Sequence, residues 1–422
     1  MSLTSLHALD DYDPDSMPVE QAQRIIQQHL HPIPETECVP LRDALHRVLV
    51  VGIHSPVNVP PHDNSAMDGY AFRHTDHAAL KIVGHAFAGH PYTGRVEVGT
   101  CIRIMTGAPI PDGCDTVVMQ EHTRREDDNL IIERMPKPGQ NIRRCGEDIT
   151  ERTLILPQGT WIQAAELGLL ASLGFDRVEV VRKLRVALLS TGDEIRQPGE
   201  PLTAGQIYDS NRYSLYGMLQ PMNVEIIDLP SIADDRDSLR QGFLDAARQA
   251  DVVITSGGVS VGEADFIKAL LAEIGEVVFW KIAMKPGRPL AFGKLGSAYF
   301  FGLPGNPVAV MVTFRQFVQA ALRRLMGLPA RTPVALSAVC TEAIRKIPGR
   351  TEFQRGILTR EASGQWTVRT TGAQGSGILS SMSKANCFIV LPAEAGNIAS
   401  GVNVEVQPFD QGEHAPFWLE AS

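Results

Sequence analysis

The segment from residue 250 to residue 307 constrains the fold of this chain more than any other. It opens with the apolar run DVVITS at residues 251–256, which is short and rich in β-branched residues, as buried strands are. Gly257 and Gly258 follow at once, and apolar residues at helical spacing start at Phe266. A strand, a glycine turn and a helix in this order direct backbone N–H groups and the positive end of the helix dipole at an anion. We therefore expect an α/β unit with an anion-binding loop.

Two further loops of the same segment combine glycine, proline and an adjacent apolar run. They read MKPGRP at residues 284–289 and GLPGNP at residues 302–307, and the first carries two cations. One such turn is as often structural as functional, but three in one α/β unit favour a ligand crevice at the carboxyl ends of the strands. We predict that a phosphate-bearing ligand binds there. The residues predicted to hold it are Ser256, Gly257, Gly258, Ser260, Gly262, Pro304, Gly305 and Asn306.

The length and composition are those of a globular protein of several domains. A chain of 422 residues exceeds one ordinary core and predicts about two to four domains. The net charge of −9 provides no overall basic surface for nucleic acid, so an anion site has to rely on local cations and backbone dipoles. The six cysteines include no C-x-x-C pair, and no secretory signal or membrane-spanning apolar run is visible. We expect a cytoplasmic protein with no nucleic-acid or membrane partner.

Changes of pattern along the chain predict four domains. Apolar residues recur at helical spacing over 19–30 and again over 161–173, and we expect these two helices to pack together. Short β-like runs lie between them, and similar runs return near the end of the chain. Alternating strands and helices in the middle predict a parallel, three-layer αβα sheet, and the absence of a G-x-G-x-x-G fingerprint after a strand argues against a dinucleotide cofactor. The predicted domains are a helical linker and dimerisation domain at 1–55 and 149–181, an inserted β domain at 56–148, an α/β domain at 182–329 and a C-terminal β domain at 330–422.

Two polar loops of the inserted region supply further carboxylates. The loop at 60–70 holds Asp63 and Asp68, and the segment at 139–148 places Asp148 near two arginines. Each has an ordinary explanation, as an Asx-type loop or as a solvated charged turn. Carboxylates beside phosphate-binding loops are also what Mg²⁺ needs, and lysines and arginines stabilise a tetrahedral oxyanion. No Ser/His or Cys/His pair stands out, so the sequence favours metal-assisted and electrostatic chemistry over covalent catalysis.

Four motifs, DNSAMDGY at 63–70, SGGVSVGEAD at 256–265, KPGRP at 285–289 and GLPGNP at 302–307, resemble those of one enzyme family. This family is the molybdopterin molybdenumtransferases, to which the C-terminal domain of gephyrin also belongs. The resemblance implies Mg²⁺-dependent insertion of molybdate into adenylylated molybdopterin, with release of AMP and molybdenum left on the dithiolene sulfurs. It also implies a molybdopterin-binding type of α/β domain, a C-terminal domain like a small β-barrel, and a homodimer in which the α/β domain of one subunit faces β domains of the other.

The resemblance further implies roles for individual residues. The loop at 256–262 corresponds to the phosphate-binding loop of the family. The residues at functional positions are Asp68, Thr106, Asp148, Glu194, Asp234, Asp265, Lys281, Lys285, Arg355 and Ser376. Of these, Lys285, Arg355 and Ser376 are assigned to the molybdate oxyanion, and Asp148, Glu194 and Asp265 to the metal or the pyrophosphate.

Two departures and two alternatives accompany this interpretation. Arg288 stands where many relatives have Lys, which keeps the charge but changes the donor geometry, and Ala309 stands where relatives often have Ser. A molybdopterin adenylyltransferase would share the α/β unit but would not need the two β domains and the helical arm. A non-enzymatic scaffold of the gephyrin type would be expected to carry long linkers. An adenylyltransferase and recipient molybdoenzymes are further expected partners, and the residues do not distinguish molybdate from tungstate.

Overall fold

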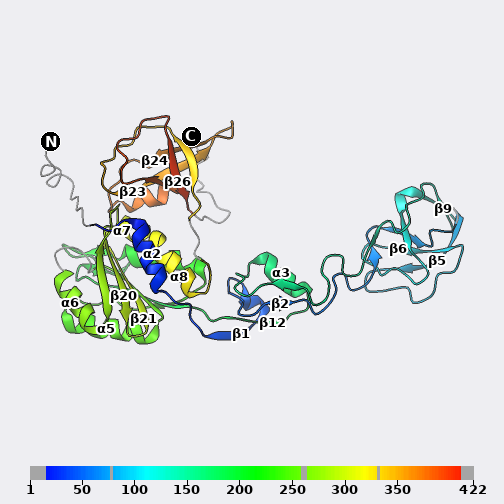
Figure 1. Cartoon of the computed structure of the whole chain (residues 1–422), viewed down its shortest axis with the longest axis horizontal. Coiled ribbons are helices and arrows are strands. Elements are labelled where there is room, and N and C mark those ends of the chain that lie inside the picture. The colour runs from blue at the N-terminus through cyan, green and yellow to red at the C-terminus, as the bar shows by residue number, and fades with distance from the viewer. Residues whose placement is uncertain (1–15, 77–78, 258–263, 330–332, 410–422) are drawn as a thin grey trace. The chain divides into compact units, whose positions relative to one another are not determined.

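The computed structural model describes residues 16–76, 79–257, 264–329 and 333–409. The chain forms two compact units, each with hydrophobic cores of its own (Figure 1). Unit 1 comprises Met1–Glu37, His46–Val48 and Val181–Ser422, and unit 2 comprises Cys38–Leu45 and Leu49–Val180.

The α/β part of unit 1 is built on a six-stranded mixed sheet. Its first four strands are parallel, and the fifth runs antiparallel to the strands on both sides of it. A two-residue turn at Gly296 joins the fifth strand to the fourth. The predicted parallel sheet is therefore correct for four strands, and the apolar runs beside the 284–289 loop add an antiparallel pair. The strand order is β16 (Glu225–Asp228), β13 (Arg185–Ser190), β17 (Val252–Ser256), β21 (Ala298–Leu303), β20 (Pro289–Leu295) and β18 (Glu276–Lys281).

Helices cover both faces of this sheet, which confirms the predicted three-layer αβα arrangement (Figure 1). On one face, Leu239 and Phe243 of α5 pack with Leu270 of α6 against the strands. On the other face, α4 packs against α7. None of the described helices is long and apolar enough to cross a membrane. The bounds are α4 (Ser210–Leu219), α5 (Arg236–Gln249), α6 (Ala264–Ile274), α7 (Pro307–Thr313) and α8 (Gln319–Leu325), with a π-helical turn at Phe314–Val318 joining the last two.

The N-terminal helix α2 (Val19–His29) belongs to unit 1. It packs against α8 and the π-helical turn, where Gln23 Nε2 donates to the Gln316 carbonyl at 3.0 Å. The helix in the 161–173 region, α3 (Ala164–Ser172), packs instead against the 3₁₀ turn Leu41–Ala44 in the core of unit 2. Each of these two helices therefore packs within its own unit, and the predicted pairing between them stays a prediction.

The C-terminal part of unit 1 is a second six-stranded sheet that closes on itself. Strand β23 pairs with both β24 and β25, so the sheet forms the small barrel-like structure that was predicted. Its core contains Cys340, Ile389 and Val406, all fully buried. The strand order is β19 (Met284–Lys285), β23 (Thr351–Arg360), β24 (Trp366–Thr370), β22 (Leu336–Cys340), β26 (Asn403–Pro408) and β25 (Cys387–Leu391), and the helix α9 spans Leu379–Lys384.

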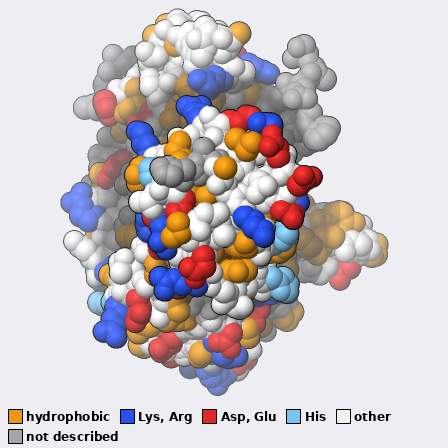
Figure 2. Space-filling view, turned by 90° about the vertical axis from the view of Figure 1, so that its right-hand side faces the viewer, with side chains coloured by type: hydrophobic (Ala, Val, Ile, Leu, Met, Phe, Trp, Pro, Cys, Tyr) orange, Lys and Arg blue, Asp and Glu red, His pale blue; other side chains and the backbone are white. Residues whose placement is uncertain are grey.

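Unit 2 contains a third six-stranded sheet, formed by the short runs predicted between residues 70 and 133. Both of its faces are covered by apolar side chains: Tyr70 and Phe72 point to one core, and the intervening Ala71 points to another. Figure 2 shows charged side chains spread over the outer surface of this inserted sheet. The order is β7 (Thr116–Met119), β4 (Gly69–Phe72), β6 (Thr100–Ile104), β5 (Ala79–Ala86), β9 (Asn129–Ile132) and β8 (Thr123–Glu126).

Four shorter pairings complete the description of the strands. The two-stranded pieces of unit 2 are β10 (Ile142–Arg143) with β3 (Asn64–Ser65) and β11 (Leu154–Leu156) with β2 (Ile53–His54). The others are β1 (Thr36–Pro40) with β12 (Arg177–Val181), and β14 (Ile195–Arg196) with β15 (Ile207–Tyr208). The four domain ranges stay a prediction.

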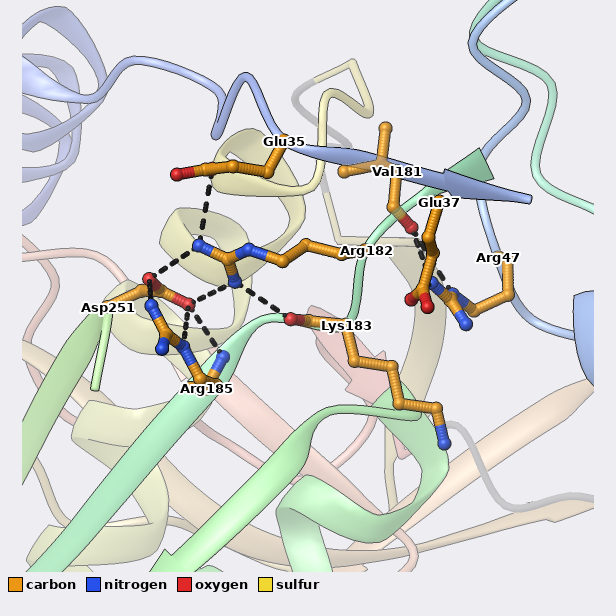
Figure 3. Close-up of polar contacts among 8 residues, drawn as sticks. All are labelled: Glu35, Glu37, Arg47, Val181, Arg182, Lys183, Arg185 and Asp251. Carbon is orange, nitrogen blue, oxygen red and sulfur yellow. Dashed lines mark hydrogen bonds and ion pairs between the residues drawn. The ribbon is translucent and has the colours of Figure 1, made fainter. Parts of the chain in front are cut away.

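A charged cluster at the start of β17 joins distant segments of unit 1 (Figure 3). The Asp251 carboxylate accepts hydrogen bonds from Arg182 at 2.7 and 2.8 Å and from the Arg185 backbone N–H at 2.8 Å. Arg182 also pairs with Glu35 at 3.2 Å. Burial opposes ionisation of Asp251, but these hydrogen bonds outweigh it and hold the pKa of the carboxyl below its usual range. The cluster therefore ties the chain segments around residues 35 and 182 to the start of β17, an inner strand of the α/β sheet.

Candidate functional site

The carboxyl ends of three parallel strands form the floor of the candidate site. Ser190 of β13, Ser256 of β17 and Leu303 of β21 lie at equivalent positions in the register. Because the strands are parallel and adjacent, the loops that follow them leave the same edge of the sheet. The described start of the predicted 256–262 loop thus lies beside the 302–307 loop, at the edge of the sheet where α/β proteins form their ligand crevice.

The backbones of these loops approach one another closely. Gly257 has a φ of +92°, and a Cβ there would lie 3.0 Å from the Thr191 carbonyl. A Cβ on Gly305 would lie 3.9 Å from the Gly257 Cα, and the Gly257 N–H donates to the Leu303 carbonyl at 3.2 Å. Glycine is therefore required at residue 257 by both conformation and space. Of the other residues predicted for this loop, Gly258, Ser260 and Gly262 lie outside the described residues.

Buried polar atoms collect at the same edge of the sheet. Asn211 Nδ2 donates to the Gly305 carbonyl at 2.7 Å, and one Asp209 oxygen caps α4 through the Arg212 N–H at 3.0 Å. Buried polar atoms without partners cost free energy, so such atoms are suited to a polar ligand. Sequence analysis missed these groups, although Ser and Thr residues at strand ends were a visible signal. Buried side-chain atoms near these strand ends for which no hydrogen-bond partner is found include Ser190 Oγ, Thr191 Oγ1, Thr255 Oγ1, Asp209 Oδ2 and Asn211 Oδ1.

An acidic loop follows β13 and adjoins this crevice. Ile232 pairs with Thr191, and the Asp234 N–H donates to Asp193 Oδ1 at 3.2 Å. Glu194 is exposed, and its Oε2 lies only 2.5 Å from where a Cβ on Gly192 would stand. The structure thus brings predicted residues Glu194 and Asp234 to one loop system at the end of β13.

The predicted metal residues do not form a complete cluster within the described structure. Asp265 lies in α6, but its side chain is outside the described residues, and Asp148 belongs to unit 2. Among the residues that are described, no three His, Cys, Asp or Glu side chains are placed to hold a metal ion together. Glu194 is consequently the predicted metal residue that the structure positions at the crevice.

The loop at 282–288 connects the central sheet to the C-terminal sheet. Its strand β19 pairs with β23, so that Lys285 lies opposite Glu352, and Lys285 Nζ is 3.6 Å from Glu352 Oε1. Lys281, the last residue of β18, is exposed and its carbonyl accepts a hydrogen bond from the Met17 N–H at 2.8 Å. Sequence analysis missed Glu352, which the structure places directly beside a predicted site residue.

Arg355 contacts the residue before Ser376, and Ser376 contacts the start of α7. Arg355 is 1% exposed; its Nε donates to Ser381 Oγ at 3.0 Å and its Nη2 to the Gly375 carbonyl at 3.2 Å. Burial lowers the pKa of the Arg355 guanidinium to about 10, and the Glu352 charge opposes this shift. The Ser376 carbonyl accepts a hydrogen bond from the Val308 N–H at 3.0 Å, directly after the predicted 304–306 turn. Hydrogen bonds therefore connect the start of α7 to Ser376 and the adjacent Gly375 to Arg355, while Lys285 pairs with Glu352 on the same strand as Arg355.

The remaining predicted residues lie in unit 2. Asp68 Oδ1 accepts two hydrogen bonds from Thr106, one from its N–H at 2.8 Å and one from its hydroxyl at 2.7 Å. The backbone bond, followed by the hydroxyl bond, holds the pKa of Asp68 below its usual range. Asp148 has an exposed side chain, and its N–H donates to the Val59 carbonyl at 3.1 Å. The structure thus brings two of the predicted residues, Asp68 and Thr106, into direct contact.

Sequence models of known families match most of the chain. Residues 187–324 match the family described as "Probable molybdopterin binding domain". Residues 17–174 match the "MoeA N-terminal region (domain I and II)", and residues 337–409 match the "MoeA C-terminal region (domain IV)". The α/β fold with its crevice thus belongs to the class of molybdopterin-binding domains.

Individual relatives narrow this class to one family. The chain is 46% identical to a molybdopterin molybdenumtransferase from Haemophilus influenzae over 93% of this chain and 98% of that relative. It is 34% identical to gephyrin from Dictyostelium discoideum over 92% of this chain and 61% of gephyrin. The crystal structure of the molybdopterin biosynthesis moeA protein from Pyrococcus horikoshii OT3 superposes with a TM-score of 0.79 at 29% identity, covering 94% of this chain and all of that one. The chain belongs to the molybdopterin molybdenumtransferases, a family of enzymes, as the resemblance of its motifs predicted.

Proposed function

We propose that this protein inserts molybdenum into adenylylated molybdopterin and releases AMP with the help of Mg²⁺. The observation that carries the proposal is a set of contacts in unit 1. The Gly257 and Gly305 backbones lie close together, Ser376 contacts the start of α7, the adjacent Gly375 contacts Arg355, and Lys285 pairs with the strand that holds Arg355. Backbone N–H groups and buried hydroxyls at one end suit phosphate and pterin groups, and cations at the other end suit an oxyanion. One substrate that contains a pyrophosphate and a second that is a tetrahedral dianion match these two ends.

The oxyanion substrate is assigned to Lys285, Arg355 and Ser376. Arg355 is preorganised, because Ser381 and the Gly375 carbonyl hold its guanidinium on two sides. Lys285 has a half-exposed side chain and a rotatable ammonium group that can adapt to the bound anion. A rigid cation and an adaptable one together stabilise the charge of molybdate as it approaches the dithiolene sulfurs.

The exposed carboxylate of Glu194 fits a role in holding Mg²⁺. No ion pair engages it within the described residues, and it lies beside the phosphate-binding edge of the sheet. Mg²⁺ is usually held by one or two carboxylates together with water and substrate phosphates, so a complete protein cage is not required. Glu194, with Asp265 and Asp148 as the other proposed ligands, would hold the ion, which supplies charge neutralisation on the pyrophosphate.

We also propose that the protein is a homodimer. Large apolar and aromatic side chains are exposed around α4, among them Tyr213 at 56% and Tyr216 at 44%. Tyr208, Tyr213 and Leu379 line one surface hollow, which extends this apolar surface toward the Ser376 loop. Exposed apolar surface of this kind is typical of a protein interface. The chemistry also requires a supplier of adenylylated molybdopterin and enzymes that accept the finished cofactor, and both are proposed partners.

The test is molybdate-dependent release of AMP. Purified protein mixed with adenylylated molybdopterin and Mg²⁺ is expected to release AMP when molybdate is added. Chromatography measures the AMP that is released. Lys285→Ala and Asp148→Ala are expected to lose this activity while keeping the melting temperature of the wild type. Asp128→Ala, which removes an exposed acid from the same unit as Asp148, is the matched control and should be fully active.

One result would contradict the assigned site, and another would contradict the proposed function. Normal turnover by both Lys285→Ala and Asp148→Ala would show that the site is wrongly assigned. Tight binding of the adenylylated substrate without AMP release, seen as a rise in melting temperature, would support a scaffold role for the same pocket.

A further inference from the structure

We propose that Glu352 competes with the oxyanion substrate for Lys285, and so limits how tightly the site holds molybdate. The inference rests on the proposed function, in which Lys285 binds the oxyanion. It starts from an unusual feature of the C-terminal sheet, a buried carboxylate in contact with a proposed substrate-binding cation. Glu352 is 5% exposed, and no feature of the sequence singled it out.

The geometry fixes the carboxylate and leaves the lysine adaptable. Strand pairing sets Lys285 opposite Glu352, and Gln354 Nε2 donates to Glu352 Oε2 at 2.8 Å. Gln354 is itself buried at 6% exposure. The Lys285 side chain is 49% exposed, and its Nζ stands 3.6 Å from Glu352 Oε1, beyond the usual range of a hydrogen bond. The partner able to leave this ion pair is therefore Lys285.

Two further cations surround the same carboxylate. Lys346 is 4% exposed, and its Nζ donates to the carbonyls of Ile347, Ala393 and Ala395 at 3.0 to 3.3 Å. Burial lowers the pKa of Lys346, and the charge of Glu352 is the largest effect opposing that shift. Arg355 follows three positions along the same strand and is stabilised by the same charge. Glu352 thus balances three cations that would otherwise repel one another.

This charge balance has a consequence for substrate binding. A dianion that enters beside Lys285 and Arg355 meets a carboxylate that already occupies the lysine. Binding requires Lys285 Nζ to turn from Glu352 Oε1 toward the oxyanion, and the ion pair re-forms when the oxyanion leaves. Glu352 is in this sense a positioning residue, because it sets the resting position of Lys285. It thereby weakens the binding of any oxyanion, so that a bound oxyanion is more readily exchanged or transferred than retained.

The test is calorimetric titration of the full-length protein with molybdate. Glu352→Gln keeps the size and the hydrogen-bonding oxygen but removes the charge. Its Kd for molybdate is expected to fall about two- to fivefold, the range that loss of a competing, partly exposed ion pair allows. Glu405→Gln, which removes an exposed carboxylate from the same sheet, is the control for net charge and should leave the Kd unchanged. Glu352→Asp moves the carboxylate away from Lys285 but keeps its charge, so it should lower the Kd less. This variant replaces Glu352→Gln in the test if the Gln variant does not fold.

A double-mutant cycle separates competition for Lys285 from a general field effect. In a Lys285→Gln background, Glu352→Gln should no longer tighten binding, because the contested cation is absent. An unchanged or weaker affinity in Glu352→Gln, or a gain that persists without Lys285, would overturn the inference and leave the proposed function standing. Wild-type protein that binds no molybdate would instead overturn the proposed function, and this inference with it.

Discussion

The inserted sheet of unit 2 and the C-terminal sheet of unit 1 have the same number of strands but treat charge in opposite ways. Within the described part of residues 64–132, Asp76 is the one charged side chain that is buried. The C-terminal sheet buries Lys346, Glu352 and Arg355 together, each at 5% exposure or less. Burying charge is costly unless every group is paired, so the second arrangement requires a network of partners that the first does not. The inserted sheet can therefore present its acidic residue on a surface loop, whereas the C-terminal sheet holds its cations rigidly.

Both sheets nevertheless place a site residue immediately before a glycine in a strand. Gly69 follows Asp68, and a Cβ there would lie 1.9 Å from the Val118 carbonyl oxygen. Gly356 follows Arg355, and a Cβ there would lie 2.8 Å from Cys387 Sγ. In each case the glycine allows a close approach of the neighbouring strand. The obstacle is backbone in the inserted sheet and a side chain in the C-terminal sheet, and this difference is measurable.

The largest effect is expected for Gly69→Ala. Since the Val118 carbonyl belongs to a paired strand, it cannot move without breaking the sheet, and the substitution should cost about 3 kcal/mol or more of stability. Gly356→Ala meets side chains that can shift, and about 1 to 2 kcal/mol is expected. Denaturant unfolding measures the loss of stability, and hydrogen exchange of the backbone amides shows in which sheet it occurs. Gly168→Ala in α3, where a Cβ meets nothing within 4 Å, is the control and should be neutral or stabilising. Equal losses at Gly69 and Gly356 would remove the distinction between the two sheets.

A smaller loss of stability, with a larger loss of function, is expected for Arg355→Met. Methionine fills the space of the arginine stem but cannot donate hydrogen bonds to Ser381 or the Gly375 carbonyl. It also lacks the positive charge that balances Glu352. We expect a loss of about 2 kcal/mol, the usual cost of removing hydrogen bonds to a charged group, and no detectable molybdate binding in calorimetry. Arg360→Met, at the exposed end of the same strand, is the control and should bind molybdate normally. Full molybdate binding by the Arg355 variant would make this buried cation purely structural.

Local sequence patterns predicted individual strands and helices better than they predicted which distant segments contact one another. The strand at 251–256 was predicted from the sequence, because a buried strand leaves a short apolar run. The antiparallel pair β18 and β20 was missed, since strand direction depends on how distant segments meet. Glu352 was missed for a related reason: the first half of β23 is mostly polar, which in sequence is typical of an exposed segment. The closed sheet and its pairing with β19 bury the polar face as well, and only the fold reveals this.

The smallest expected effect is on the pKa of Asp68 in Thr106→Val. The folded-state pKa of Asp68 is depressed, so its contribution to stability is present above the unfolded pKa of about 3.9 and is lost as the pH falls through the folded value. Valine removes the hydroxyl bond at 2.7 Å but retains the shape and the backbone N–H bond at 2.8 Å. The pKa of Asp68 is therefore expected to rise without reaching its ordinary value, and the acid-induced fall in Tm should become shallower.

Carboxyl NMR titration measures this shift directly, and melting curves between about pH 6 and pH 2 follow its effect on stability. Thr123→Val, whose hydroxyl donates to the Gln120 carbonyl at 2.8 Å and not to a carboxylate, is the control and should leave Asp68 unchanged. An exposed acid held by two bonds from a single residue can be tuned by that residue without disturbing the sheet. If Thr106→Val instead destabilised unit 2 at neutral pH, the inserted sheet would depend on its polar contacts as the C-terminal sheet does, and the contrast between the two would be one of degree.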